Sequence, residues 1–379
     1  MSRTKLRNAR IDSLRGVAIA CVLLLHFTLA YGLRESPLSL VLPAELIGAI
    51  AFNGNYGVTM FFAISGFLIT THSLRRWGSL SEIDVRAFYL LRVSRIMPPL
   101  VLVLLIIVAL GSLGLPYFSN TDNNRNLPAS YFVIAAGSVL TFWHNVLMQS
   151  VGYFNYCLNI YWSLSVEEVF YLSLPLVCVG LRRNRWLLLA ALVAVAIGPL
   201  YRQIHIDNEI FYMYANPACF DAIAMGCLAA WAAQRWVLST WVASATQVVA
   251  ALGLAAVYLQ GIEGHEVWGF SLIALATATF LFASAIAPTG SARLEWWTAP
   301  LRWMGQHSYE LYLFHIVVLG LMRNLIAKDE MSYALRLPCL ATFIVVSCLI
   351  AALVARWVSE PANRALRRRL LSPAMVAAA

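Results

Sequence analysis

Two residues near the start of the chain, Arg15 and His26, combine a fixed cation with a side chain that titrates near neutral pH. They are eleven positions apart, so on an α-helix they share a face, with His26 about 16 Å further along the axis. Asp12 precedes Arg15 by three residues and is expected to hold its guanidinium in an ion pair. Because an imidazole titrates near neutral pH, it can take a proton from a hydroxyl group, which makes His26 a candidate general base. A structural histidine bonded to a neighbouring helix fits the same pattern.

Two adjacent carboxylates, Glu167 and Glu168, lie in a run that extends from Trp162 to Tyr171. Ser165 and Glu168 have the spacing of a capping box, which favours a capping role for Glu168. Adjacent side chains on a helix point about 100° apart, so we expect only one of the two carboxylates to face the protein interior. We predict that Glu167 does so, where it orients or polarises a histidine or binds an acceptor hydroxyl.

A basic segment contains Arg92 and Arg95, three positions apart on one face of a helix, with Arg75, Arg76 and Arg86 before them. A pair of guanidinium groups suits the phosphates of an anionic ligand. Clusters of this kind also mark the cytoplasmic loops of membrane proteins, and both interpretations apply here.

A polar stripe is predicted near the end of the chain. Ser308, Tyr312 and His315 follow a spacing of four and then three residues, with Tyr309 beside them. On a helix this spacing gives one polar face, which would be turned toward a cavity or another helix rather than lipid. Asp221 is a single acid in an apolar stretch, for which a structural salt bridge and a functional role are equally good interpretations.

These polar residues are set in a very apolar chain. Of its 379 residues, 61% are hydrophobic and 12% are charged, and that charged share is about half that of a soluble domain. The sequence therefore predicts an all-α, polytopic membrane protein. The net charge of +9 is distributed in short clusters between apolar stretches, which is typical of cytoplasmic loops and argues against nucleic acid as a partner. The seven cysteines include no C-x-x-C pair, so neither a disulfide framework nor a metal site is expected.

Ten apolar stretches approach the ~20 residues that cross a bilayer. They are 16–33, 47–71, 97–115, 163–181, 186–201, 217–234, 237–259, 267–287, 305–326 and 335–355. If an eleventh stretch, 130–148, also crossed the membrane, the later basic clusters would lie on the external side. Basic clusters favour the cytoplasmic side, so we expect a re-entrant or interfacial helix there. Both termini are then cytoplasmic, and loops such as 202–216 are external. The predicted organisation is one transmembrane domain, 1–363, followed by a basic cytoplasmic tail, 364–379.

Seven short motifs, in order along the chain, resemble those of the acyltransferase 3 family, in a form that lacks an additional soluble domain. They are Arg15 with His26, residues 57–69, residues 92–98, Trp162-Ser163-Leu164 with Glu167, Phe220-Asp221-Ala222, Gly305 with Ser308-Tyr309 and 312–315, and Glu360-Pro361.

This resemblance implies a membrane-bound bacterial O-acyltransferase with about ten transmembrane helices in the cytoplasmic (inner) membrane. It implies an acyl-CoA donor, by default acetyl-CoA, that acts as a co-substrate and not as a permanently bound cofactor. The acceptor is a hydroxyl of a carbohydrate or of a glycosylated small molecule. His26 and Arg15 are then essential, with Glu167 as a third catalytic candidate. Arg92, Arg95 and Ser65 serve the donor, and the remaining candidates line the acceptor site or cavity: Asp12, Trp162, Tyr171, Asp221, Tyr309, Tyr312 and His315.

A proton-coupled transporter without acyl-transfer chemistry is the alternative. It would also carry a histidine near mid-membrane, a buried acid and polar stripes. The sequence contains no inverted pair of interrupted helices and no internal repeat, which are typical of such carriers. An acyltransferase is therefore the better prediction, and a purely structural scaffold fits poorly with so many polar groups in the spans.

Overall fold

The computed structural model describes residues 8–122, 125–286 and 296–370. The predicted basic start of the chain at Arg3, Lys5 and Arg7, and the part of the predicted tail after residue 370, lie outside the described residues. Within the described ranges the fold is helical apart from one short hairpin, in which β1 (Thr121–Asp122) pairs antiparallel with β2 (Arg125–Asn126).

Eight helical segments in the described residues are long and apolar enough to cross a membrane, so the chain is a multi-pass membrane protein. They comprise α1 (Ala9–Tyr31), α2 (Ala44–Phe52) with α3 (Asn55–Trp77), α4 (Val85–Ser112), α7 (Trp162–Leu181), α8 (Asn184–Ile204), α11 (Thr240–Gln260), α12 (Gly269–Ile286), and α15 (Arg336–Val354) with α16 (Glu360–Leu370).

Two further helices correspond to the other predicted spans, 217–234 and 305–326. These are α10 (Asn216–Ala233) and α14 (Ser308–Leu325), each of 18 residues. Both carry polar side chains toward the bundle, among them Asp221 and His315, which are almost fully buried. Eight of the ten predicted spans are therefore found as segments apolar enough to cross a membrane, and the other two form more polar helices.

The segment predicted not to cross forms two short helices instead of one. They are α5 (Phe132–Leu140) and α6 (His144–Val151), about 13 Å and 12 Å long. Neither can span a bilayer of ~30 Å, in agreement with the prediction. The remaining helices are α9 (Glu209–Tyr214), α13 (Ala299–Gln306) and 3-10 turns at Pro37–Leu40, Leu80–Glu82, Pro116–Phe118, Ala129–Tyr131, Asn159–Tyr161 and Trp296–Thr298.

Breaks interrupt several of the predicted spans. The chain leaves helical geometry between α2 and α3, where Gly54 lies so close to the backbone of Cys21 on α1 that a side chain would not fit. A second break at His307 separates α13 from α14. A π-helical stretch, Ala355–Ser359, joins α15 to α16. The first two breaks divide predicted spans into two helices each, whereas the π-helical stretch carries α15 on into α16 as one continuous segment.

Small residues allow the central helices to pack closely. Gly66 on α3 faces the carbonyl oxygen of Ile223 on α10, and Gly226 on α10 faces the carbonyl oxygen of Ala63 on α3. A Cβ atom at either glycine would overlap that oxygen, so backbone meets backbone at this crossing. Close approach through small residues is how helices associate in lipid, where the hydrophobic effect gives no preference for protein over lipid. This crossing fixes α3, which carries Ser65.

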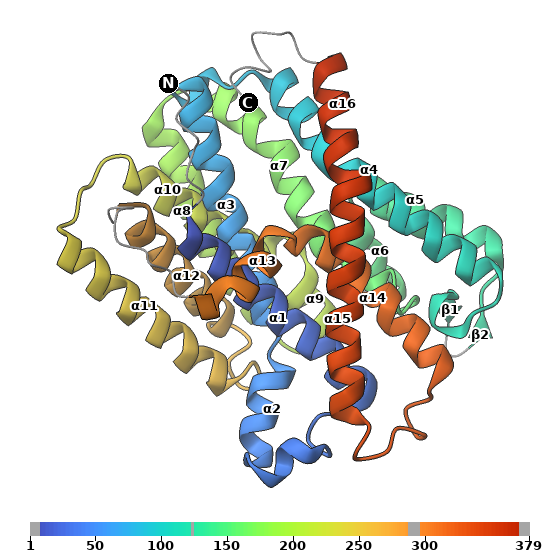
Figure 1. The fold of residues 1–379 in the computed structure, drawn as a ribbon. Helices are drawn as coiled ribbons and strands as arrows, with labels where there is room; N and C mark the ends of the chain where they lie inside the picture. The colour runs from blue at the N-terminus through green and yellow to red at the C-terminus, as the bar shows by residue number, and fades with distance from the viewer. Residues whose placement is uncertain (1–7, 123–124, 287–295, 371–379) are drawn as a thin grey trace.

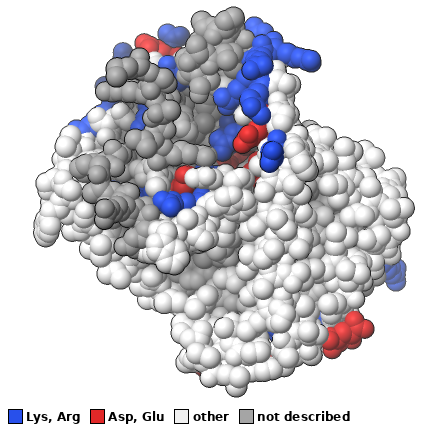
Figure 2. Space-filling view, viewed as in Figure 1, with Lys and Arg blue, Asp and Glu red and all other residues white. Residues whose placement is uncertain are grey.

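Figure 1 shows α15 continuing into α16 from the bottom to the top of the view, with α11 and α12 to the left, α4, α5 and the β1–β2 hairpin to the right, and α1, α3 and α7 between α12 and α15. The end of α3, the start of α4 and α16 meet at the upper end of this view. Lys and Arg residues gather at that end, whereas the middle of the molecule is almost free of charge on the face shown in Figure 2. The basic clusters 75–95 and 364–369 thus share one end of the bundle.

Candidate active site

A cavity of about 350 Å³ opens inside the bundle between α1, α3, α4, α7 and α14, and it is reached by Arg367 of α16. One end is basic, and the other end reaches the polar face of α14. Eight of the thirteen residues predicted from the sequence to form the site line this cavity, namely Arg15, Ser65, Arg92, Arg95, Glu167, Tyr171, Tyr309 and Tyr312.

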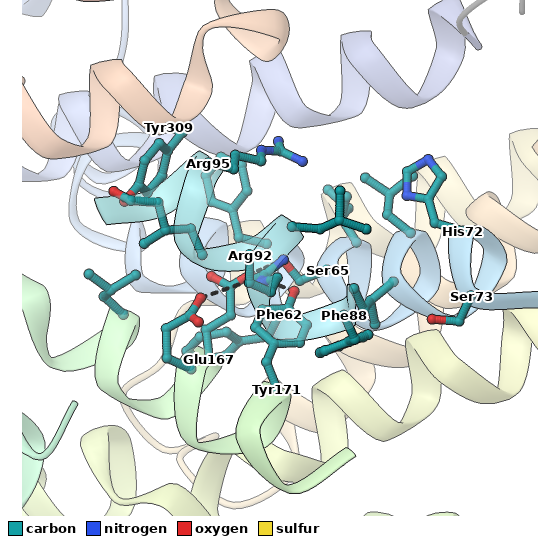
Figure 3. Close-up of a pocket in the computed structure, with 18 of the residues that line it drawn as sticks. Phe62, Ser65, His72, Ser73, Phe88, Arg92, Arg95, Glu167, Tyr171 and Tyr309 are labelled. Carbon is teal, nitrogen blue, oxygen red and sulfur yellow. Dashed lines mark hydrogen bonds and ion pairs between the residues drawn. The ribbon is translucent and has the colours of Figure 1, made fainter. Parts of the chain in front are cut away.

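Arg92 forms the centre of an ion-pair cluster at the wall of the cavity. Its Nη2 lies 2.8 Å from Oε1 of Glu168 and 3.9 Å from Oε1 of Glu167. Glu167 also accepts hydrogen bonds from Ser65 and, at 2.7 Å, from the Tyr171 hydroxyl. The guanidinium of Arg92 stacks 3.3 Å from the centre of the Tyr171 ring. Figure 3 shows these side chains converging, with the Arg95 side chain extending away from them.

This cluster corrects two predictions about the adjacent carboxylates. Both face the interior, because the long side chain of Arg92 can reach two positions that are 100° apart on α7. The capping role of Glu168 is wrong: α7 begins at Trp162, so Ser165 lies inside the helix, where it accepts a hydrogen bond from the backbone N–H of His144. Glu168 is a buried partner of Arg92.

The predicted polar stripe of α14 is present, and its members contact α1 and α7. Arg15 donates a hydrogen bond of 2.7 Å to the Ser308 hydroxyl, and lies 4.0 Å from Asp12. The Tyr312 hydroxyl lies 2.5 Å from Oγ of Ser163 and donates to the carbonyl of Ile160 at 2.6 Å. The stripe therefore connects α1 and α7 at the inner end of the cavity.

His315 completes the stripe and meets His26. The Nε2 atom of His315 lies 3.1 Å from Nδ1 of His26, and their ring centres are 5.0 Å apart. His315 is fully buried, and its ring lies 5.9 Å from that of Tyr312. Among the described residues His26 does not line the cavity; a chain of contacts leads to it from Tyr312 through His315. The described hydrogen bonds of Glu167 go to other groups, so the predicted contact between Glu167 and an imidazole is not made.

Comparison with known sequences connects this arrangement to a family. A profile of the acyltransferase 3 family, described as an acyltransferase domain, matches residues 8–357. The chain belongs to this family. It is similar to the O-acetyltransferase OatA of Staphylococcus aureus, with 25% identity over 73% of this chain and 48% of that protein. It is also similar to the peptidoglycan O-acetyltransferase OatA of Listeria monocytogenes, with 25% identity over 93% of this chain and 55% of that protein.

The chain spans about half the length of those two relatives. No solved structure matches it.

Two predicted site residues, Asp221 and Trp162, lie by a separate small cavity. Asp221 pairs with Arg202, both 1% exposed, with Nη2 and Oδ2 2.6 Å apart, and Ser271 bonds to both. Arg202 also donates to the carbonyls of Val267 and Ala218. A pair so completely satisfied favours the structural interpretation of Asp221, one of the two given above. The predicted loop 202–216 begins after Ile204, where α8 ends, and it contains the short helix α9.

Sequence reasoning missed part of the basic end of the cavity. His72, Arg75 and Arg76 on α3 line it together with Arg367, which was assigned to the tail. The signal for the first three was their spacing of three and four residues, which places them on one helical face. No sequence signal identified Arg367, because its position depends on the docking of α16 against α4.

Proposed function

We propose that this acyltransferase is an integral membrane O-acetyltransferase that moves an acetyl group from acetyl-CoA to a hydroxyl of a carbohydrate or of a glycosylated acceptor. The observation that carries the proposal is the cavity, which has arginines at one end and the polar face of α14 at the other. This shape and charge suit a donor with an anionic head and a long, thin arm that ends in the reactive group. The names of the two relatives support acetyl as the acyl group and a cell-wall glycan as the class of acceptor.

The phosphates of the donor would bind at the basic end, on Arg95 together with Arg75, Arg76 and Arg367. Arg367 lies close enough to Arg95 and Arg76 for the three charges to interact. Cations held together in this way favour a polyanionic ligand. The charge of Arg92 is opposed by two carboxylates, so we assign it to the cavity wall and not to the phosphates.

The thioester would lie at the other end, near Arg15 and Tyr312. The transfer needs a base to take the proton of the acceptor hydroxyl, and we assign that role to His26. The acceptor oxygen attacks the thioester carbonyl carbon, the carbon–sulfur bond breaks, and the CoA thiolate leaves and receives the proton from the imidazolium. Arg15, held by Ser308, stabilises the negative charge that develops. In a relay through acyl-histidine, a nitrogen of His26 attacks the thioester carbonyl carbon and the carbon–sulfur bond breaks to release the CoA thiolate. The acceptor oxygen then attacks the acyl-imidazolium, the carbon–nitrogen bond breaks to free His26, and the proton of the acceptor hydroxyl passes to the thiolate.

Access to His26 requires a movement of Tyr312. Its ring lines the cavity and contacts the ring of His315, and its hydroxyl is held by Ser163 and the Ile160 carbonyl. Release of those two hydrogen bonds would let the thioester approach the imidazole. We place the basic end of the bundle in the cytoplasm of a bacterium, because positive clusters remain inside and acyl-CoA is supplied there. The protein then lies in the inner membrane, and both of its termini are cytoplasmic.

The first experiment measures CoA release by chromatography from the purified protein in detergent, with acetyl-CoA and cell-envelope glycans. A thiol reagent is unsuitable because the chain contains seven free cysteines of its own. His26→Ala should lower the acceptor-dependent rate by about 100-fold or more, whereas His265→Ala, at an exposed position, should leave it unchanged. If the wild type releases no CoA under any condition and reconstituted vesicles accumulate solute in response to a proton gradient, the chain is a transporter.

A second experiment tests the donor end with a matched pair on α16. Arg367 lines the cavity, whereas Arg364 is exposed and bonds only to the backbone of its own helix. Loss of one charge-assisted hydrogen bond should raise the KM for acetyl-CoA about 10- to 100-fold in Arg367→Gln. Arg364→Gln should match the wild type. With S-acetylpantetheine, which lacks the nucleotide phosphates, the two variants should behave alike; a persisting difference would place Arg367 outside the phosphate site.

A further inference from the structure

His26 and His315 are joined in a short chain of hydrogen bonds whose ends are both backbone carbonyls. Nδ1 of His315 lies 2.9 Å from the carbonyl oxygen of Leu311, one turn earlier on α14. Nδ1 of His26 lies 3.0 Å from the carbonyl oxygen of Val22, one turn earlier on α1, and 3.1 Å from Nε2 of His315. These contacts fix where the protons are.

A carbonyl oxygen can only accept a hydrogen bond, so Nδ1 of His315 must carry a hydrogen. The Nε2 atom of a neutral His315 then has a lone pair and accepts from its neighbour. Nδ1 of His26 must carry a hydrogen as well, because it faces both the Val22 carbonyl and that lone pair. The remaining nitrogen of His26, Nε2, is left with a lone pair. In the described part of the chain, the hydrogen bonds of His26 are all made by Nδ1.

We propose that His315 is a positioning residue that holds His26 as the Nδ1–H tautomer, with Nε2 as the basic or nucleophilic atom. This inference rests on the proposed function and specifies its reactive atom. When His26 takes a proton at Nε2, the Nδ1–H of the resulting imidazolium donates to the lone pair of His315, which strengthens that hydrogen bond. A neutral partner thus performs the task that a carboxylate performs in the Ser-His-Asp arrangement.

His315 suits this task because its own position leaves little freedom. It is fully buried, its Nδ1 is held by Leu311, and its ring packs against Tyr312 and Phe343, at centre distances of 5.9 Å and 6.4 Å. A ring fixed on three sides presents its lone pair in one direction. The same packing connects it to Tyr312, so the cavity wall and the base are in contact through His315.

The test compares three substitutions at or beside His315. In His315→Gln, the side-chain carbonyl oxygen can take the place of Nε2 and accept from His26. In His315→Leu, similar volume remains but no acceptor. In Phe343→Leu, the packing against the His315 ring changes while the acceptor stays. We expect kcat to fall about 10- to 100-fold in His315→Leu with KM for acetyl-CoA nearly unchanged, as for the loss of one hydrogen bond to a charged group. His315→Gln should recover most of the rate, and Phe343→Leu, which loosens one of the three contacts of the ring but keeps the acceptor, should lower the rate less than His315→Leu does.

Two further measurements separate positioning from a purely structural effect. In a His26→Ala background, His315→Leu should cause no additional loss of rate, because the two residues act as a unit. Nitrogen-15 spectra of histidine-labelled protein should show a protonated Nδ1 and a bare Nε2 for His26 in the wild type and in His315→Gln. In His315→Leu the Val22 carbonyl is the one remaining acceptor described for that hydrogen, so the spectra should show a smaller share of the Nδ1–H tautomer than in the wild type.

A wild-type His26 that carries its hydrogen on Nε2 would overturn the proposal, as would full activity in His315→Leu. The spectra do not depend on turnover. If the wild type transfers no acyl group, the proposed function fails, and the tautomer assignment is still decided by the spectra alone.

Discussion

The contacts of Arg92 predict that its replacement mainly lowers the free energy of unfolding and has a smaller effect on the KM for acetyl-CoA. The side chains of Arg92 and Glu168 are 18% and 6% exposed, and their charged atoms are 2.8 Å apart. Removing one partner of a buried pair costs about 3–5 kcal/mol, because the other charge stays buried without compensation. Arg92→Met leaves both Glu168 and Glu167 uncompensated, so we expect a loss at the upper end of this range. Glu168→Gln leaves Glu167 to interact with Arg92, so we expect a loss at the lower end.

The assay is equilibrium unfolding in mixed micelles, combined with the KM for acetyl-CoA. Combining Arg92→Met with Glu168→Gln should lower the free energy of unfolding by much less than the sum of the two single changes. The double variant has neither a buried cation without a partner nor the second buried carboxylate. Arg95→Met, three residues along α4, is the control: it should raise the KM with little change in stability. If Arg92→Met instead leaves the free energy of unfolding within about 1 kcal/mol of the wild type and raises only the KM, Arg92 binds the donor and the reasoning from its contacts is refuted.

Three other variants test the packing, the second ion pair and the cavity wall. Gly226→Ala should lower the free energy of unfolding by about 1–3 kcal/mol, because its Cβ would overlap the Ala63 carbonyl. Gly253→Ala, with open space around it, should leave that free energy unchanged or raise it. Equal losses in the two variants would exclude the close crossing of α3 and α10. Asp221→Asn should cost about 3–5 kcal/mol by leaving Arg202 as a buried unpaired cation, and unchanged stability would show that water or a ligand reaches that pair. Tyr312→Phe removes two hydrogen bonds worth about 1–3 kcal/mol together, and we expect faster hydrolysis of acetyl-CoA without acceptor; a slower rate would assign the hydroxyl itself to catalysis.

The helices and the polar face of α14 could be predicted from the sequence because both depend on local periodicity. An apolar stretch of about 20 residues determines its own secondary structure in lipid, since the backbone must satisfy its hydrogen bonds internally. The spacing of Ser308, Tyr312 and His315 likewise determines their common face whatever the rest of the fold. The same applies to the expectation that Arg15 and His26 share a face, because both contact α14.

The partners of these residues could not be predicted, because they come from distant parts of the chain. His26 and His315 are 289 positions apart, and a sequence shows no reason why α1 and α14 should meet there. One of the two roles predicted for Glu167 was to orient the imidazole, but its described hydrogen bonds go to Ser65 and Tyr171. The expectation that only one of the two adjacent carboxylates faces the interior failed for a physical reason. The side chain of Arg92 is long enough to contact both Glu167 and Glu168, and the spacing of the two carboxylates does not show this.

The basic end of the cavity shows why the end of the chain belongs to the site. Its arginines come from α3, α4 and α16, and α16 reaches α4 only because the π-helical stretch at Ala355–Ser359 carries α15 on into it. An extra residue in a helical turn rotates everything that follows by about 100°, so this stretch decides which face of α16 meets the bundle. Arg367 lines the cavity and Arg364 is exposed, although both belong to one basic run. Charge patterning alone treats such a run as a solvated tail, whereas the register of one helix turns one of its members into part of the cavity.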